Sequence, residues 1–330
     1  SRGAILAVVR RGEVDFLRGD LSSALDALEE GRRLCVHSSL GKSPVAADIS
    51  RQIGKIRSLQ GDSVQALASL RCAMELYSDA GMDATAEAAE TTRLIGVILY
   101  HDGKPGEALA RYDRAWRTYE ALGMRRSLAA AELLRNMASA LRELGDVSRA
   151  IEQLRLAWEA HEHTGTTGSV EAAGLLRNFA QAYAASGDRE AARSNLEAAR
   201  ALHEASGTTR SSEFATLQLF EGEWRAREGA RSEAVACLRT AAAIFESLGM
   251  HSSRDALKSR RALKREVLQV FQDVEQSTGW KLNASMLLQT VRKLGLQLSE
   301  QDFNAVLLNT GGPDTCCYDA FLTWVFELPG

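Results

Sequence analysis

Four arginines recur at intervals of 42 residues, and three of them are followed directly by a residue with an amide side chain. The arginine column consists of Arg51, Arg93, Arg135 and Arg177, and the amide column of Gln52, Asn136 and Asn178. A guanidinium group can bind a carboxylate through two parallel hydrogen bonds, and an amide can both donate to and accept from a peptide group. Together these residues predict a groove that binds an acidic or carboxylate-ended peptide segment.

The same arginines also allow a purely structural interpretation. Glu90 lies three residues before Arg93, and Glu132 lies three residues before Arg135. Oppositely charged residues at this spacing lie side by side on a helix and stabilise it by about 0.2–0.5 kcal/mol. Glu13 and Glu223 would also place negative charge at the ends of the same groove. The sequence leaves both interpretations open.

Two short motifs resemble catalytic signatures but lack required residues. Gly41-Lys42-Ser43 matches the end of a phosphate-binding loop, yet Val36 stands where that loop needs its first glycine. His161-Glu162-His163 would need a histidine at position 165 to form a zinc-protease motif, and that residue is Gly165. We therefore expect no enzyme, no catalytic residue and no cofactor.

The remaining histidines and cysteines also fit structural roles. His161 and His203 occupy the repeat position that holds Tyr77, Tyr119 and Phe245, so we expect them to pack in the core. The five cysteines are Cys35, Cys72, Cys237, Cys316 and Cys317. Their spacing does not match a zinc site, and reduced thiols packed as small apolar residues favour the cytoplasm. We predict no metal site.

The arginine spacing belongs to a wider repeat of 42 residues. Glycine recurs as Gly19, Gly61, Gly103, Gly145, Gly187 and Gly229. Alanine follows each of these glycines by five residues and a large apolar residue follows by nine, while the residue seven positions before is always small. A fixed period of this length is typical of a solenoid whose units stack on one another.

Each unit reads as two helices joined by a tight turn. In the third unit, apolar residues from about 84 to 101 follow helical spacing until Asp102-Gly103 interrupts them. Glycine readily adopts the left-handed conformation that ends a helix, and Pro105 suits the first turn of the next one. The small residues fit places where two helices nearly touch. The pattern therefore predicts helix, turn, helix and loop in every unit.

This arrangement resembles the tetratricopeptide repeat, and its 42-residue length is similar to the long units of the kinesin light chain family. Leu134-Arg135-Asn136-Met137-Ala138 and Leu176-Arg177-Asn178-Phe179-Ala180 look like that family's Leu-Asn-Asn-Leu-Ala segment. The resemblance covers about residues 5–250. It implies an all-α, right-handed superhelical solenoid of six helix-turn-helix repeats, in which the first helix of each unit lines the concave groove. We assign residues 1–252 to this solenoid.

After Met250 the glycine repeat stops, and residues 253–330 are predicted to form a small helical domain. Residues from about 254 to 276 read as one helix whose first half is basic, with Lys258, Arg260, Arg261, Lys264 and Arg265. We expect it to cap the solenoid in the place of a seventh first helix. A basic amphipathic helix also suits a calmodulin-type target or a membrane surface.

Residues of about 264–327 resemble a calmodulin-type pair of EF-hands. A calcium loop needs glycine at its sixth position and a bidentate glutamate at its twelfth. In the first loop, Glu275 to Met286, these positions hold Trp280 and Met286. The second loop, around Asn309 to Ala320, ends in Ala320 and contains Pro313. We therefore expect a degenerate pair, kept for its helical packing, that does not bind calcium.

Composition limits the classes of partner. The chain of 330 residues has a formal net charge of −3, which argues against nucleic acid and against an acidic membrane. Its apolar stretches are too short for a membrane span, and its first residues have no signal-peptide pattern. Because the sequence starts at Ser1 rather than Met, we expect that it belongs to a longer protein.

Two classes of function follow. The first is a non-enzymatic scaffold or adaptor whose concave groove binds a peptide segment of a partner protein. The second is a regulatory module, with a calcium-linked tail, of a larger enzyme or motor assembly. A catalytic domain elsewhere in the full-length protein would favour the second class.

Overall fold

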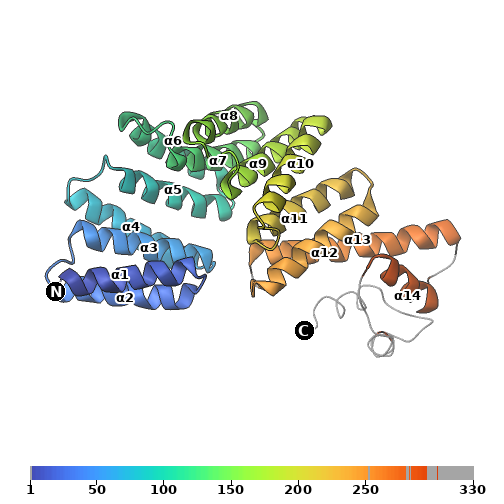
Figure 1. Cartoon of the computed structure of the whole chain (residues 1–330), viewed down its shortest axis with the longest axis horizontal. Coiled ribbons are helices and arrows are strands. Elements are labelled where there is room, and N and C mark those ends of the chain that lie inside the picture. Colours follow the sequence, from blue (N-terminus) through green and yellow to red (C-terminus); the bar gives the residue numbers. More distant parts are fainter. Residues whose placement is uncertain (1, 252, 280–281, 283, 296–302, 304–330) are drawn as a thin grey trace. The chain divides into compact units, whose positions relative to one another are not determined.

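The computed structural model describes residues 2–251, 253–279, 282, 284–295 and 303, and these residues form α-helices without any β-strand (Figure 1). The helices have the following bounds: α1 (Arg2–Leu17), α2 (Leu21–His37), α3 (Pro44–Leu59), α4 (Ser63–Asp79), α5 (Ala86–His101), α6 (Pro105–Ala121), α7 (Leu128–Glu143), α8 (Val147–Thr164), α9 (Val170–Ser186), α10 (Arg189–Ala205), α11 (Ser212–Arg227), α12 (Arg231–Ser247), α13 (Arg254–Thr278) and α14 (Ala284–Lys293). The chain divides into two compact units, residues 1–193 and 194–330.

Each unit is a stack of helix pairs. We call the odd-numbered helices up to α13 first helices and the even-numbered helices up to α12 second helices. In unit 1, α1, α3, α5 and α7 each pack on the second helix that follows, and each second helix packs on the next first helix. In unit 2, α12 packs on both α11 and α13 in the same way. This arrangement confirms the predicted all-α solenoid of stacked helix pairs.

A column of hydroxyl residues starts the first helices, and it continues beyond the last turn glycine. The residues are Ser43, Thr85, Ser127, Ser169, Ser211 and Ser253. Each side-chain oxygen accepts the backbone N–H three residues later, which satisfies one of the unpaired donors at a helix start. Because Ser253 belongs to the column, α13 begins as a seventh first helix. The repeat therefore extends further than the glycines suggested.

The length of α13 follows from one missing glycine. The position 42 residues after Gly229 holds Phe271, which is fully buried. The other first helices end at a glycine of this column, whose φ angle lies between 77° and 85°. Because α13 has no glycine there, it continues to Thr278 and ends at Gly279. Its first part packs on α11 and α12, as the first helix of a further pair would.

Small residues allow the paired helices to approach closely. A Cβ atom added to Gly54 would lie 2.6 Å from Leu70, and one added to Gly222 would lie 2.6 Å from Leu238. At Gly96 the same atom would lie 2.5 Å from the Tyr112 ring. The large apolar column of the second helices thus fills the space above these glycines, as the sequence predicts.

The second helices also end at a glycine column, which the sequence analysis overlooked. The column comprises Gly81, Gly123, Gly165, Gly207 and Gly249, with φ between 67° and 69°. The equivalent residue of the first pair is Ser39, which adopts φ 60°. Only glycine takes this left-handed conformation without steric cost, so Ser39 is a strained position.

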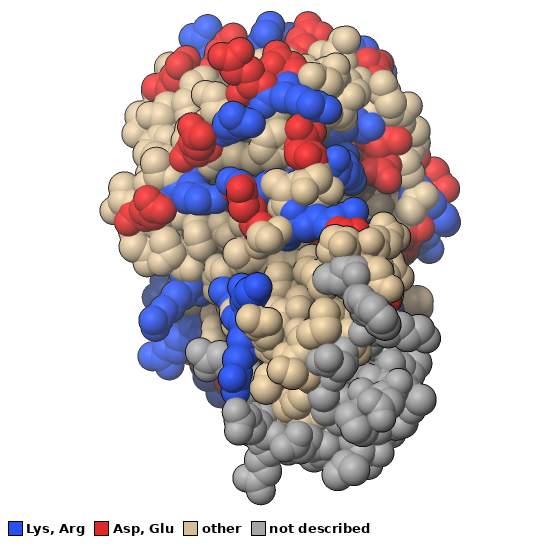
Figure 2. All heavy atoms as spheres, turned by 90° about the vertical axis from the view of Figure 1, so that its right-hand side faces the viewer, with Lys and Arg blue, Asp and Glu red and all other residues tan. Residues whose placement is uncertain are grey.

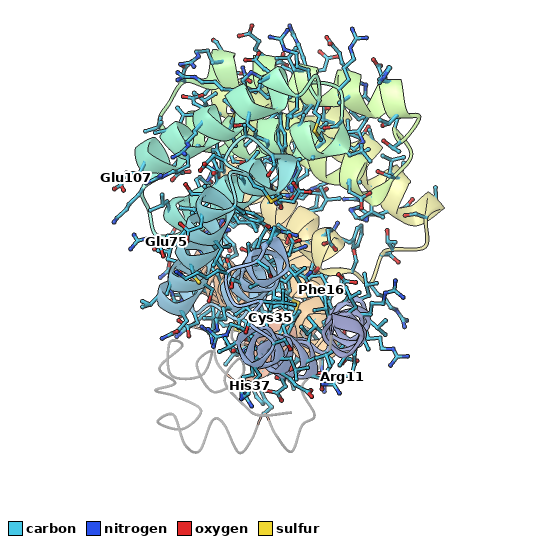
Figure 3. The ribbon with its side chains drawn as sticks, turned by 90° about the vertical axis from the view of Figure 1, so that its left-hand side faces the viewer. Arg11, Phe16, Cys35, His37, Glu75 and Glu107 are labelled. Atoms are coloured by element: carbon cyan, nitrogen blue, oxygen red, sulfur yellow. The ribbon has the colours of Figure 1, made fainter. Side chains whose placement is uncertain are left out.

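The packing position shared by aromatic residues and histidines is buried throughout. Its members are Cys35, Tyr77, Tyr119, His161, His203 and Phe245, each at most 5% exposed. Cys35 lies in α2 at the N-terminal end of unit 1 (Figure 3). His161 Nδ1 lies 2.9 Å from Thr166 Oγ1, and His203 Nδ1 lies 2.9 Å from Thr208 Oγ1. Where the column holds tyrosine or phenylalanine, the residue five positions later is methionine instead.

Candidate functional site

The arginine and amide columns lie on four successive first helices of unit 1, α3, α5, α7 and α9. Contacts between residues 39 positions apart show that these helices present the same face to one another. Gln52 Nε2 donates to Glu13 Oε1 at 3.3 Å, and Asn178 Nδ2 donates to Ser139 Oγ at 3.1 Å. The structure therefore brings the predicted site residues onto one face of the stack.

Arg93 is the most buried member of the arginine column, with only 4% of its surface exposed. Its Nε and Nη2 atoms donate to the two oxygens of Glu90, both at 2.7 Å, and Nη1 lies 3.1 Å from Glu132 Oε1. Burial disfavours the charged form, but the hydrogen bonds that Arg93 donates to Glu90 and the charges of Glu90 and Glu132 outweigh it and raise the pKa of Arg93. Arg93 therefore joins α5 to α7 as an internal ion pair.

Arg51 is held in a similar way by a different set of groups. Its Nη2 atom lies 3.1 Å from Asp48 Oδ1, and its Nε atom donates to Tyr77 Oη at 3.4 Å. Tyr77 in turn donates to Asp48 Oδ1 at 2.6 Å. Burial and the neighbouring Asp48 raise the pKa of Tyr77, so its hydroxyl stays protonated as a donor. Asp48, which lies three residues before Arg51, was not recognised from the sequence.

Arg135 and Arg177 are more accessible than Arg93. The Arg135 side chain is 31% exposed, and its Nη2 atom lies 3.8 Å from Glu132 Oε1. Arg177 is half-buried. Its helix carries Gly174, rather than an acidic residue, at the position three residues before it. Arg135 is thus more exposed than Arg51 and Arg93, whose side chains are 20% and 5% exposed.

Two buried atoms of the amide column lack hydrogen-bond partners. Among the described side chains, these atoms are Asn136 Nδ2 and Asn178 Oδ1. Amide O and N positions are assigned from their surroundings, so each residue is best described as having one unused polar atom. Leaving a buried polar atom without a partner costs about 1–3 kcal/mol, and this cost would be recovered if the amide turned toward a ligand that supplies the missing bond. This feature could not be read from the sequence, because it depends on what the neighbouring helix offers.

Metal and membrane sites were sought in the same described residues. They contain no cluster of three or more histidine, cysteine, aspartate or glutamate residues placed to hold a metal ion. None of their helices combines the length and the apolar character that crossing a bilayer requires. Glu275 lies within α13, and its Oε1 atom accepts the N–H of Leu282 at 3.0 Å. Of the predicted first calcium loop, residues 275–278 belong to α13 and residues 284–286, including Met286 at the twelfth position, belong to α14. Trp280 and the second loop, residues 309–320, lie outside the described residues.

Comparisons with known proteins agree with the fold. Residues 87–162 match the family model described as tetratricopeptide repeat. No curated protein sequence matches the chain.

Among solved structures, the Rap conjugation gene regulator of plasmid pLS20, in complex with the Phr* peptide, is 14% identical with a TM-score of 0.59, covering 87% of this chain and 71% of that one. The apo form of RapI is 13% identical with a TM-score of 0.55, and the match covers 89% of this chain and 99% of RapI. A third structure is a variant of the nearly identical TPR-like repeats of a Podospora anserina protein named as a kinesin light chain. It is 17% identical with a TM-score of 0.50, and the match covers 63% of this chain and 97% of that one. Residues 87–162 therefore match tetratricopeptide repeats, and the chain has the fold of solenoids built from such repeats.

Proposed function

We propose that unit 1 is a non-enzymatic adaptor that binds an extended peptide segment of a partner protein across α3, α5, α7 and α9. The observation that carries this proposal is the pair of unused amide atoms at Asn136 and Asn178. They occupy one register position on successive first helices, and a peptide backbone presents both N–H and C=O groups at regular intervals. The fold similarity to a Rap regulator solved with a peptide supports the same mode of binding.

The arginine column contributes unequally to this proposed site. Arg93 is buried and held by two carboxylates, so we assign it to the stability of the stack. Arg135 and Arg177 are accessible enough to reach a ligand, and we propose that a carboxylate of the peptide binds at this end of the face. Gln52 and Arg51 would contact the other end of a longer segment.

Selection from a displayed library of 15-residue peptides, using the full chain as bait, tests the proposal. The dissociation constant of a selected peptide is then measured by fluorescence anisotropy for the wild type and for Asn136→Ala/Asn178→Ala. Losing two hydrogen bonds of about 1 kcal/mol each predicts a weakening of at least tenfold. The variant removes two buried unsatisfied atoms but also the bond from Asn178 to Ser139, so we expect its thermal stability to stay close to that of the wild type.

A matched control is Gln153→Ala, which removes an amide from the second helix α8. It should leave the affinity within twofold of the wild type. Equal affinities for the wild type and the asparagine variant, or equal losses in the asparagine and glutamine variants, would refute the proposed site.

A further inference from the structure

The first half of α13 carries a line of exposed basic residues. This basic stripe consists of Arg254, Lys258, Arg261 and Arg265, spaced by four, three and four residues, so that all lie on one side of the helix. All four residues are exposed, and the side chains of Lys258 and Arg265 are 53% and 65% exposed. With a rise of about 1.5 Å per residue, the stripe is about 16 Å long.

One member of the stripe occupies a register position of the candidate groove residues of unit 1. Arg261 lies 84 residues after Arg177 and belongs to the arginine column. The hydrogen bond from Thr216 Oγ1 to Asp255 Oδ2, 3.3 Å long, joins α11 to α13 across an interval of 39 residues. That interval is also found between the first helices of unit 1. The stripe therefore lies on the equivalent face of α13.

The charge three residues before the arginine is reversed in α13. In α3, α5 and α7 that position holds Asp48, Glu90 and Glu132, which bind the arginines of their own stack. In α13 it holds Lys258. Arg261 thus has Lys258 three residues before it and Arg265 four residues after it, and like charges at these spacings repel one another.

Neighbouring carboxylates offset only part of this charge. Lys258 Nζ lies 2.8 Å from Glu223 Oε2, and Arg265 Nε lies 3.0 Å from Glu266 Oε1. The Glu266 carboxylate is shared, because its Oε2 atom lies 3.6 Å from Arg231 Nη1. Six of the twelve residues from 254 to 265 are basic and one is acidic, in a chain whose net charge is −3. In Figure 2, Lys and Arg side chains gather at the lower left with few Asp or Glu side chains beside them.

We propose that the basic stripe of α13 binds an acidic polypeptide segment of a partner protein. The stripe is one helix wide and borders the Glu223 carboxylate, so it suits discrete carboxylates better than the broad phosphate array of a nucleic acid or a membrane. Leu257, which is 40% exposed between Arg254 and Lys258, offers an apolar contact to the same segment. The proposal concerns unit 2 and does not depend on the proposed site of unit 1.

A fluorescein-labelled 12-residue peptide of glutamate, with leucine at every fourth position, serves as the probe. Its affinity for the full chain is measured by fluorescence anisotropy. We expect Lys258→Glu/Arg261→Glu/Arg265→Glu to weaken binding at least tenfold, and we expect binding of the wild type to weaken as salt rises from about 50 to 300 mM.

The control makes the same charge change on another helix. Arg111→Glu/Arg114→Glu/Arg117→Glu alters three exposed arginines of α6, and the affinity should stay within about threefold of the wild type. Circular dichroism verifies that both variants keep their helices. Failure of the wild type to bind the peptide, or equal weakening by both triple variants, would overturn the proposal. Tighter stripe-dependent binding of duplex DNA or of phosphatidylserine vesicles would overturn it as well.

Discussion

Helices α3, α5 and α7 of unit 1 and helix α13 carry arginine at the same repeat position, yet the residue three positions before it is acidic in unit 1 and basic in α13. Arg51 and Arg93 are held by Asp48 and by Glu90 with Glu132, and Arg93 is almost completely buried. Arg261 is exposed beside Lys258 and Arg265. A repeated residue therefore has no fixed role. In α3 and α5 an acidic residue three positions before the arginine holds it in the stack, whereas in α13 that position holds Lys258 and the arginine is exposed.

The largest effect should appear when the same substitution is made in both regions. Arg93→Met leaves Glu90 and Glu132 without their shared cation, and we expect the free energy of unfolding to fall by about 2–3 kcal/mol. The loss should be in the lower part of the range for a broken buried pair, because Glu132 is half-exposed and can be hydrated. Urea unfolding followed by circular dichroism measures the change.

Arg261→Met is the matched variant, and it should change stability by less than about 0.5 kcal/mol, since exposed substitutions rarely exceed this value. Amide hydrogen exchange should become faster in α5 and α7 of the Arg93→Met variant, which would locate its loss of stability in the two helices that Arg93 joins. If the two variants were equally stable, the assignment of Arg93 to the stack and of Arg261 to a partner would be wrong.

A second comparison is between the repeats that hold histidine at the buried packing position and those that hold tyrosine there. It concerns how the stability of the fold depends on pH. Burial lowers the pKa of His161, and the positive charge of Arg135 lowers it further. The hydrogen bond with Thr166 and the negative charge of Glu171 raise it, but they offset only part of the effect. Below an unfolded-state pKa of about 6.5 the unfolded chain binds the proton more readily than the folded chain, so the free energy of unfolding falls as pH decreases.

The paired replacement His161→Tyr/Thr166→Met, which copies the residues found at 119 and 124, should reduce this loss of stability. Thermal unfolding at pH 7.5 and at pH 5.5 compares the variant with the wild type. An identical pH dependence in both proteins would show that His161 does not contribute.

The smallest effect is expected at the strained end of α2. Ser39→Gly relieves the positive φ angle of 60° and should raise the free energy of unfolding by about 0.5–1 kcal/mol. Gly81→Ala, at the equivalent position of the next pair, should lower it by about 1 kcal/mol. A stability loss in Ser39→Gly would show that the serine side chain compensates for its backbone strain.

The sequence was a good guide to the architecture because stacking imposes a strict spacing. The turn glycines and the small residues opposite Leu70, Tyr112 and Leu238 follow directly from helix approach, and they are visible as columns. The sequence also predicted a helix of about residues 254–276 in the place of a seventh first helix, and the hydroxyl column that includes Ser253 agrees with it.

The candidate site was less predictable, because it depends on contacts between neighbouring helices. The sequence identifies Arg93 and Glu90 as neighbours on one helix, but the bond from Arg93 to Glu132 joins two helices. The interval of 39 residues that describes such contacts becomes apparent only when the stack is known. The unused atoms of Asn136 and Asn178 likewise reflect what the next helix fails to provide.

The most direct test of the central claim is the affinity of the glutamate-rich peptide for two reciprocal single variants. Lys258→Glu places an acidic residue before Arg261, as in unit 1, whereas Glu132→Lys removes the acidic residue before Arg135. We expect Lys258→Glu to weaken binding about tenfold and Glu132→Lys to leave it unchanged or strengthen it. Unchanged binding in Lys258→Glu, together with weaker binding in Glu132→Lys, would contradict the account.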